Sequence, residues 1–372
     1  MRRVEIGGAT SIGLWVLGAC GSANLAACGS ANPVPAGTQL GPALTAAMNA
    51  ADRARTPWRC GASDGPVLTA ETIGANATGA GGAPARGVWR LEGHVVSREG
   101  DGEIVIAAIA DAGGAAPPTI AALGRLRERL SSADVVIALG GMGTTKAELE
   151  ATLGEIANKV PIVVMPGDLE DAGELADAIV ALRAKGTIVI DGRRVHRIEI
   201  GDVTVGLVSG AGAASRLVAG VEGCAYAPQD VVAIARDLSM RKGVRILASS
   251  EAPREVRGGE PTGELGVTVG NEVSGSPAPG AGSSAPADAG SSTGSGSMAA
   301  DSVIEIDIAL HGPMAEGATR ARTGGRDSNA VALTPGTLDA TPRLPDPARS
   351  PTAGLLVIRG DTWSWKPIAD SP

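Results

Sequence analysis

Aromatic side chains are almost absent from this chain of 372 residues, which has five Trp, one Tyr and no Phe. A nucleic-acid surface built on base stacking needs such rings, so the sequence lacks the means to form one. Positive charge is also in deficit, because 32 Lys and Arg stand against 40 Asp and Glu and leave a net charge of −8. We therefore expect no nucleic-acid partner, and a core built from Val, Ile, Leu and Ala.

Long hydrophobic runs are also missing, since none reaches the roughly 18 apolar residues of a membrane-spanning helix. Residues 1–28 instead predict an export signal, because Arg2 and Arg3 precede a modest apolar stretch. The sequences LGAC, ending at Cys20, and LAAC, ending at Cys28, are typical of a bacterial lipobox. We expect an exported protein, lipid-anchored through Cys20 or Cys28 at the periplasmic face of a membrane or at the cell surface. The alternative is an ordinary secretory signal or an unprocessed tail.

Cysteine and histidine are scarce, with four Cys and three His, and none of their spacings matches a zinc site. Cys60 and Cys224 remain after the two lipobox cysteines, and they form an even pair in an oxidising compartment. Either they form a disulfide that ties the N-terminal segment to the domain, or they are two unpaired buried thiols. His94, His196 and His311 are expected to be structural residues.

Composition divides the chain into five segments. Residues 1–28 form the signal, 29–100 a low-complexity tether and N-terminal strand region, 101–270 an α/β core, 271–300 a disordered insertion, and 301–372 the strands that complete the core. The insertion is assigned because Gly, Ser, Pro and Ala dominate it and cannot bury apolar area. Residues 69–87 are expected to form another loop.

Apolar runs of strand length alternate with helical patterns between Ile104 and Ser249, which predicts an α/β fold with a mostly parallel sheet covered on both faces. The expected strands are 104–110, 135–139, 162–165, 187–190 and 244–248, and the expected helices are 119–130, 146–157, 175–184 and 230–240. Residues 195–200 and 203–208 flank Gly201-Asp202 and predict a hairpin. The ending is expected to be rich in strands, at 303–310, 330–333, 355–358 and 362–365.

Ligands of open α/β sheets bind beyond the carboxyl ends of the strands. At these places the sequence reads DAG from Asp111, GGMG from Gly140, PGDLE from Pro166, SEAP from Ser250 and HGPMA from His311. In this order the segments resemble the motifs of the calcineurin-like metallophosphoesterases, which are DxH, GD, GNH followed by D or E, a single H before proline, and GHxH. The resemblance covers about residues 104–367, and it implies that family's layered α/β fold and metal-dependent phosphoester hydrolysis.

The family's ligand positions are mostly altered in this chain. Asp111 keeps the first aspartate, whereas the histidine positions hold Gly113, Leu169, Glu251, Pro313 and Ala315. Gly141 stands where the family has the aspartate that bridges two metals, and Asp168 where it has asparagine. A two-metal centre needs the shared ligand to hold its cations about 3.5–4 Å apart. The resemblance therefore implies a domain whose two-metal centre is lost.

Two further candidate sites lie at the strand ends, and for each the plainer alternative is the leading interpretation. Asp111, Asp168 and Glu251 are expected to converge at one rim, where they would hold one Mg²⁺ or Mn²⁺ or, alternatively, act as solvated or helix-capping acids. The loop of Gly140, Gly141, Gly143 and Thr144 follows a strand and opens a helix. Its N–H groups would receive an anion, or else it is a tight turn with Thr144 or Thr145 as the N-cap.

The leading interpretation is an exported, lipid-anchored protein with a metallophosphoesterase-like domain that is catalytically inactive and binds a small ligand or an envelope protein. The first alternative is a single-metal phosphoesterase that uses Asp111, Asp168 and Glu251. The second is an unrelated solute-binding or structural envelope lipoprotein. Apart from that single ion, no cofactor is expected.

Overall fold

The computed structural model describes residues 60, 68–73, 88–100, 102–157, 160–212, 223–252, 255–256, 268–269, 306–312, 322–325, 330–339 and 352–370. All of them belong to the compact unit Asp52–Pro372. The expected signal with Cys20 and Cys28, and the expected insertion at 271–300, lie outside the described residues.

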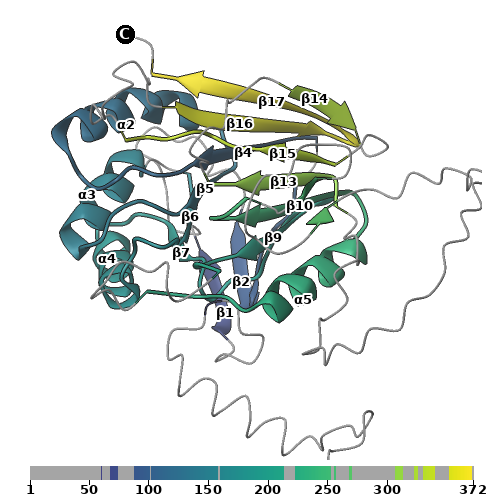
Figure 1. Ribbon diagram of the computed structural model, residues 1–372, viewed down its shortest axis with the longest axis horizontal. Helices are drawn as coiled ribbons and strands as arrows, with labels where there is room; N and C mark the ends of the chain where they lie inside the picture. The colour runs from purple at the N-terminus through teal and green to yellow at the C-terminus, as the bar shows by residue number, and fades with distance from the viewer. Residues whose placement is uncertain are drawn as a thin grey trace, which may run out of the picture. The chain divides into compact units, whose positions relative to one another are not determined.

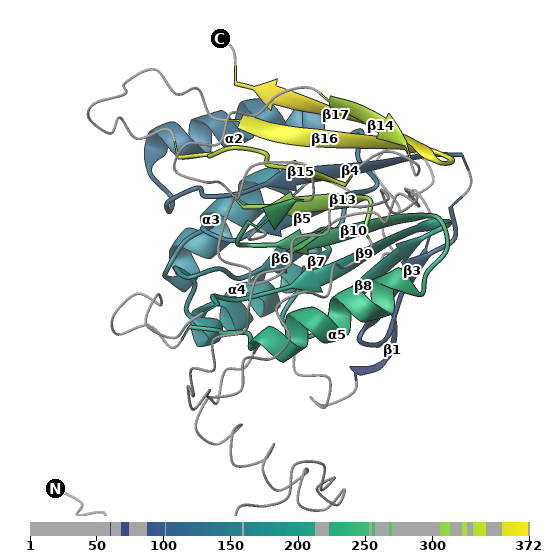
Figure 2. The same ribbon diagram turned by 45° about the vertical axis from the view of Figure 1, so that its right-hand side comes forward.

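The first of two large sheets has the strand order β1-β2-β3-β8-β9-β10-β13-β15 (Figure 2). Its strands are β1 (Leu68–Ile73), β2 (Trp89–Gly93), β3 (Val95–Arg98), β8 (Arg197–Ile200), β9 (Val203–Val208), β10 (Val244–Ser249), β13 (Ile308–His311) and β15 (Val331–Leu333). The strands from β9 to β15 pair in parallel. The predicted hairpin is confirmed, because β8 and β9 are antiparallel neighbours.

The second sheet has the strand order β14-β17-β16-β4-β5-β6-β7 (Figure 1). Its strands are β14 (Arg322–Gly325), β17 (Thr362–Ala369), β16 (Thr352–Arg359), β4 (Glu103–Ile109), β5 (Val135–Leu139), β6 (Ile162–Met165) and β7 (Val189–Asp191). Strands β4 to β7 are parallel, and β16 joins them antiparallel to β4. A short separate pair is formed by β11 (Glu255–Val256) and β12 (Thr268–Val269).

Helices cover the outer faces of both sheets, α2 to α4 on the second sheet and α5 on the first (Figure 1). They are α2 (Pro117–Leu130), α3 (Lys146–Ile156), α4 (Ala172–Ala184) and α5 (Pro228–Ser239). Within the described part of the chain, none of the helices combines the length and the apolar character needed to cross a bilayer. The layers are therefore helix, sheet, sheet and helix.

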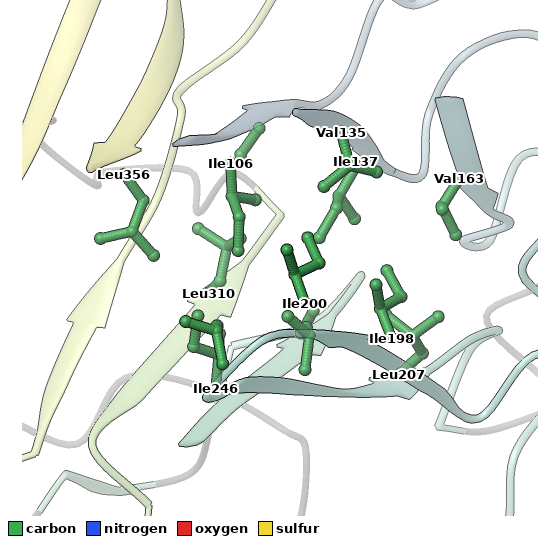
Figure 3. Packing of buried hydrophobic residues seen from close by; sticks show 14 of the residues in the cluster. Ile106, Val135, Ile137, Val163, Ile198, Ile200, Leu207, Ile246, Leu310 and Leu356 are labelled. Atoms are coloured by element: carbon green, nitrogen blue, oxygen red, sulfur yellow. The ribbon is translucent and has the colours of Figure 1, made fainter. Parts of the chain in front are cut away.

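The inner faces of the two sheets pack directly on one another. Figure 3 shows Ile106 and Ile137 of the second sheet facing Ile200 and Ile246 of the first, and all four are fully buried. Trp363 and Trp365 are two residues apart on β17, so their rings lie on the same face of the sheet. Both belong to this central cluster. Branched aliphatic side chains thus build the central core, which agrees with the scarcity of aromatic residues. This arrangement confirms the α/β fold class expected from the sequence.

One buried ion pair joins the two sheets at the edge opposite the carboxyl ends of the parallel strands. Arg98 at the end of β3 lies 3.0 Å from Asp134, which directly precedes β5. The other oxygen of Asp134 accepts the backbone N–H of Val105 at 2.8 Å. Because both oxygens of this carboxylate have donors, its burial between the sheets is tolerated.

The expectation of a loop over residues 69–87 is wrong in its first part. Leu68–Ile73 forms β1, antiparallel to β2, with an irregular register between Leu68 and Glu71. The short segment has no clean alternation of apolar and polar residues, so its pairing depends on the edge that β2 offers. The expected single sheet is likewise two sheets, because β8 and β9 continue into a sheet separate from that of β4 to β7.

A disulfide joins Cys60 to Cys224, with the Cα atoms 5.5 Å apart and a sequence separation of 164. This Cα distance falls in the usual range for the bond. The N–H of Cys60 also donates to the carbonyl oxygen of Ala225 at 3.0 Å. The bond therefore fixes the described start of the chain beside the segment that leads into α5.

We predict that replacing Cys60 and Cys224 with serine lowers the free energy of unfolding by about 2–4 kcal/mol, because the unfolded chain loses a long-range cross-link. Urea unfolding measures the change. A reducing agent should lower the stability of the wild type by the same amount and leave that of the double variant unchanged. Equal sensitivity of the two proteins to reduction would contradict the prediction.

Candidate functional site

The carboxyl ends of the parallel strands of both sheets meet at one edge of the molecule. The N–H of Asp111 donates to the carbonyl of Gly140 at 2.9 Å, which joins the ends of β4 and β5. The N–H of Gly210 donates to the carbonyl of Pro166 at 2.7 Å, which links the first sheet to the second. The N–H of Gly312 bonds to the last residue of β10 at 3.0 Å. The turns singled out in the sequence therefore lie together.

Asp111 at the end of β4 is held by a segment that comes late in the chain. It is the one described residue other than glycine with a positive φ, of 51°. The hydroxyl of Thr337 lies 2.9 Å from both its Oδ2 atom and its carbonyl oxygen. The N–H groups of Leu338 and Asp339 donate to the same carbonyl at 3.0 and 2.8 Å. The side chain and the backbone of Asp111 are thus both used inside the fold.

The two glycines at the expected ligand positions differ in the space around them: Gly141 faces backbone, and Gly113 makes a tight approach to a side chain. Gly141 has φ of 74°, and a Cβ atom there would lie 2.7 Å from the Cα atom of Asp111. Gly113 has φ of 62°, and a Cβ atom there would lie 3.0 Å from the Oδ2 atom of Asp339. Side chains other than glycine are strained at such φ values as well. The backbone as it stands therefore does not fit a bridging carboxylate at 141 or an imidazole at 113.

Glu251 follows β10 and is engaged by neighbouring groups. Its Oε1 atom accepts the N–H of Gly212 at 2.9 Å, and its Oε2 atom accepts the hydroxyl of Tyr226 at 2.6 Å. Tyr226 follows the disulfide by two residues and is buried. Glu251 therefore ties the turn after β10 to the segment that the disulfide anchors.

Asp168 lies partly exposed in the turn after β6. Over the described ranges, no three His, Cys, Asp or Glu residues are grouped so that they could hold a metal ion. The structure thus does not gather Asp111, Asp168 and Glu251 into one ligand set there. Pro313 and Ala315 lie outside the described residues.

The glycine-rich loop after β5 is bound by the chain's own carboxylates. Glu170 accepts the N–H of Met142 at 2.6 Å, and Glu148 accepts the N–H groups of Thr144 and Thr145 at 3.0 and 3.2 Å. Thr145 is the N-cap of α3, and with Glu148 it forms a capping box. These three N–H groups, which a bound anion would need, are satisfied internally.

Glu170 is the buried acid that sequence analysis passed over. Its Oε2 atom accepts the N–H of Gly167 at 2.8 Å, so the carboxylate joins the turn after β6 to the loop after β5. Burial raises the pKa of Glu170 to about 7, and its bonds from Met142 and Gly167 act in the opposite direction. The spacing from Gly167 to Glu170, like that of a capping box, was the available signal.

The histidines have structural surroundings. His311 is buried at the end of β13, with Nδ1 2.7 Å from the carbonyl oxygen of Gly312, and burial lowers its pKa to about 4. The rings of His94 and His196 stack with centroids 4.4 Å apart and planes 6° from parallel. Burial and the neighbouring His94 lower the pKa of His196 to about 4. The in-plane lone pairs of stacked rings do not converge, so this pair does not make a metal site.

We predict that Glu170→Gln changes the pH dependence of stability. The folded pKa lies above the unfolded one, so the stability contributed by Glu170 is complete below about pH 4.5 and is lost as pH rises through 7. Relative to the variant, the wild type should therefore lose on the order of 1–3 kcal/mol between these pH values. Urea unfolding of both proteins from pH 4.5 to 8 tests this, and parallel curves would disprove it.

Comparison with known proteins leaves the family open. A scan against protein-family models and a search of curated proteins find no match. Among solved structures, TT1561 of Thermus thermophilus is 11% identical with a TM-score of 0.35, covering 69% of this chain and 98% of that one. GAP50, the anchor in the inner membrane complex of Plasmodium, is 8% identical with a TM-score of 0.36, covering 73% and 86%. The purple acid phosphatase PPD1 from yellow lupin seeds is 10% identical with a TM-score of 0.41, covering 76% and 55%. This chain is similar in fold to these proteins, and values this low do not assign it to a family.

Proposed function

We propose that this chain is an exported lipoprotein whose metallophosphoesterase-like domain has lost its two-metal centre and acts by binding a small ligand or an envelope protein. The order of five strand-end segments and the layered α/β fold support the domain type. The lipobox sequences that end at Cys20 and Cys28 support export and a lipid anchor at the periplasmic face of a membrane or at the cell surface.

The close approach of Gly141 to Asp111 is the main observation in support of the proposed loss of catalysis. A carboxylate that bridges two cations would start from a Cβ atom at position 141, and that atom would lie 2.7 Å from the Cα atom of Asp111. Without a shared ligand, two cations cannot be held at the short separation that a two-metal hydrolase needs. We therefore derive no hydrolytic step for this domain.

A protein of this kind would act by binding through its surface rather than by cleaving a bond. Its strand-end carboxylates, among them Glu170 and Glu251, accept hydrogen bonds from the chain's own N–H groups. This arrangement leaves those oxygens fixed in the fold and favours recognition of a whole ligand or partner over chemistry on a bound phosphate.

We predict that the full-length protein, purified from membranes in detergent and incubated with Mn²⁺, retains less than one ion per chain after gel filtration. It should also fail to hydrolyse a generic phosphodiester such as bis(p-nitrophenyl) phosphate. Elemental analysis and release of p-nitrophenol measure the two quantities. An active phosphodiesterase of the calcineurin-like family treated in the same way is the positive control. Two bound ions, or turnover that a chelator abolishes, would overturn the proposal.

We further predict that one of the two substitutions Cys20→Ser and Cys28→Ser releases the protein from the membrane fraction, because it removes the sulfur that carries the lipid. The other substitution should leave fractionation unchanged and so serves as the matched control. Incorporation of radiolabelled palmitate measures lipidation directly. If both single variants and the double variant remain labelled and in the membrane, the lipid anchor is refuted.

A further inference from the structure

Residues Thr334–Asp339, here called the bridging segment, cross the strand ends beside Asp111, the aspartate that the resemblance aligns with the family's first ligand. The hydroxyl of Thr334 lies 3.4 Å from the carbonyl of Gly312 beyond β13 of the first sheet. Three residues later, Thr337 contacts Asp111 at the end of β4 in the second sheet. The N–H of Thr352, at the start of β16, donates to the carbonyl of Thr337 at 2.9 Å. The segment thus connects both sheets at their carboxyl edge.

The bridging segment belongs to the hydrophobic core. Leu338 is completely buried, and it packs in the same cluster as Ala112 and Met142, which follow β4 and β5. Its N–H lies 3.0 Å from the carbonyl oxygens of both Ala110 and Asp111. Apolar burial and backbone pairing together hold this part of the segment against the strand ends.

Asp111 is the point to which the polar contacts of the bridging segment converge. Its carbonyl receives N–H groups from Leu338 and Asp339, and its Oδ2 atom receives the hydroxyl of Thr337. That hydroxyl also accepts the N–H of Asp339 at 3.1 Å. The contacts bind Asp111 in a left-handed conformation that aspartate adopts only at a cost, so the surrounding structure must stabilise it.

The bridging segment also takes the space of a neighbouring ligand position. The Oδ2 atom of Asp339 lies 3.0 Å from where a Cβ atom would stand on Gly113. On the other side, Gly141 has no room for a side chain against the backbone of Asp111. Position 141 is therefore closed by backbone, and a side chain at position 113 would have to displace the carboxylate of Asp339.

We infer that the bridging segment has replaced a metal as the device that holds the strand ends together, with Asp111 acting as its structural anchor through Thr337. The inference rests on the proposed loss of the two-metal centre and adds a role for the aspartate that remains. It implies that restoring single ligands does not restore metal binding, because the space is taken.

A double-mutant cycle tests the anchor contact in the full-length protein. Thr337→Val and Asp111→Ala should each lower the melting temperature, by roughly 2–4 °C for the loss of one part-buried hydrogen bond. The double variant should lose less than the sum of the two single losses, since both changes remove the contact between the Thr337 hydroxyl and the Oδ2 atom of Asp111. Thr337→Ser keeps the hydroxyl and should melt like the wild type. Thr362→Val removes an exposed hydroxyl bonded to the Arg359 carbonyl, and it is the control for the substitution itself.

Asp111→Asn keeps a side chain that tolerates positive φ and an oxygen that accepts from Thr337, so this variant should fold even if Asp111→Ala does not. The cycle is then repeated in the Asp111→Asn background. There Thr337→Val should lower the melting temperature as much as it does in the wild type. If Thr337→Val melts like the wild type and Thr362→Val, or if the effects of Asp111→Ala and Thr337→Val simply add, the anchor role is overturned.

A second measurement separates this inference from the proposed function. Gly141→Asp and its control Gly141→Ala should both lower the melting temperature, and calorimetric titration with Mn²⁺ should detect binding to neither. Binding of Mn²⁺ to Gly141→Asp alone overturns the inference while leaving the wild type without its metal centre. Binding of two Mn²⁺ ions to the wild type overturns the proposed function itself.

Discussion

The constraint on which the candidate site depends is the close contact between the backbone of Asp111 and Gly141, at the ends of β4 and β5. These two backbone segments approach so closely that only a hydrogen atom fits on the Cα atom of residue 141. This approach aligns the N–H of Asp111 with the carbonyl of Gly140 and the N–H of Gly113 with that of Gly141. A metal centre of the family would need a side chain in that space. The distance between the two backbone segments thus leaves no room for a side chain at position 141.

The acids of this edge serve the backbone around them. Glu148, Glu170 and Glu251 each accept N–H groups from turns that follow parallel strands. Turns with positive φ expose their N–H groups, and in many α/β proteins a bound anion satisfies them. Here side-chain carboxylates supply the negative charge, and the raised pKa of Glu170 reflects the burial that this role requires. These N–H groups therefore have hydrogen-bond acceptors within the protein.

Much of the fold was predictable because it depends on local periodicity. The strands at Val135–Leu139 and Ile162–Met165 were predicted with their observed bounds, since buried parallel strands form unbroken apolar runs. The hairpin was also predictable from local sequence, because two strand-like segments flank the turn dipeptide Gly201-Asp202. β1 was missed, because its pairing comes from a neighbouring strand, and the division into two sheets was missed, because strand order depends on contacts across the whole chain.

The candidate site shows the same division more sharply. Residue types alone indicated that Gly113, Gly141 and Leu169 offer a metal no side-chain ligand, because their side chains carry no donor atom. They did not reveal that Asp111 binds Thr337 across 226 residues, that Glu251 binds Tyr226, or that His94 stacks on His196. Local periodicity predicts helices and strands, and residue type shows which expected ligand positions lack a side-chain donor. Partners far apart in sequence are chosen only when the packed sheets bring them within hydrogen-bond distance, and that choice made Asp111 an anchor of the fold.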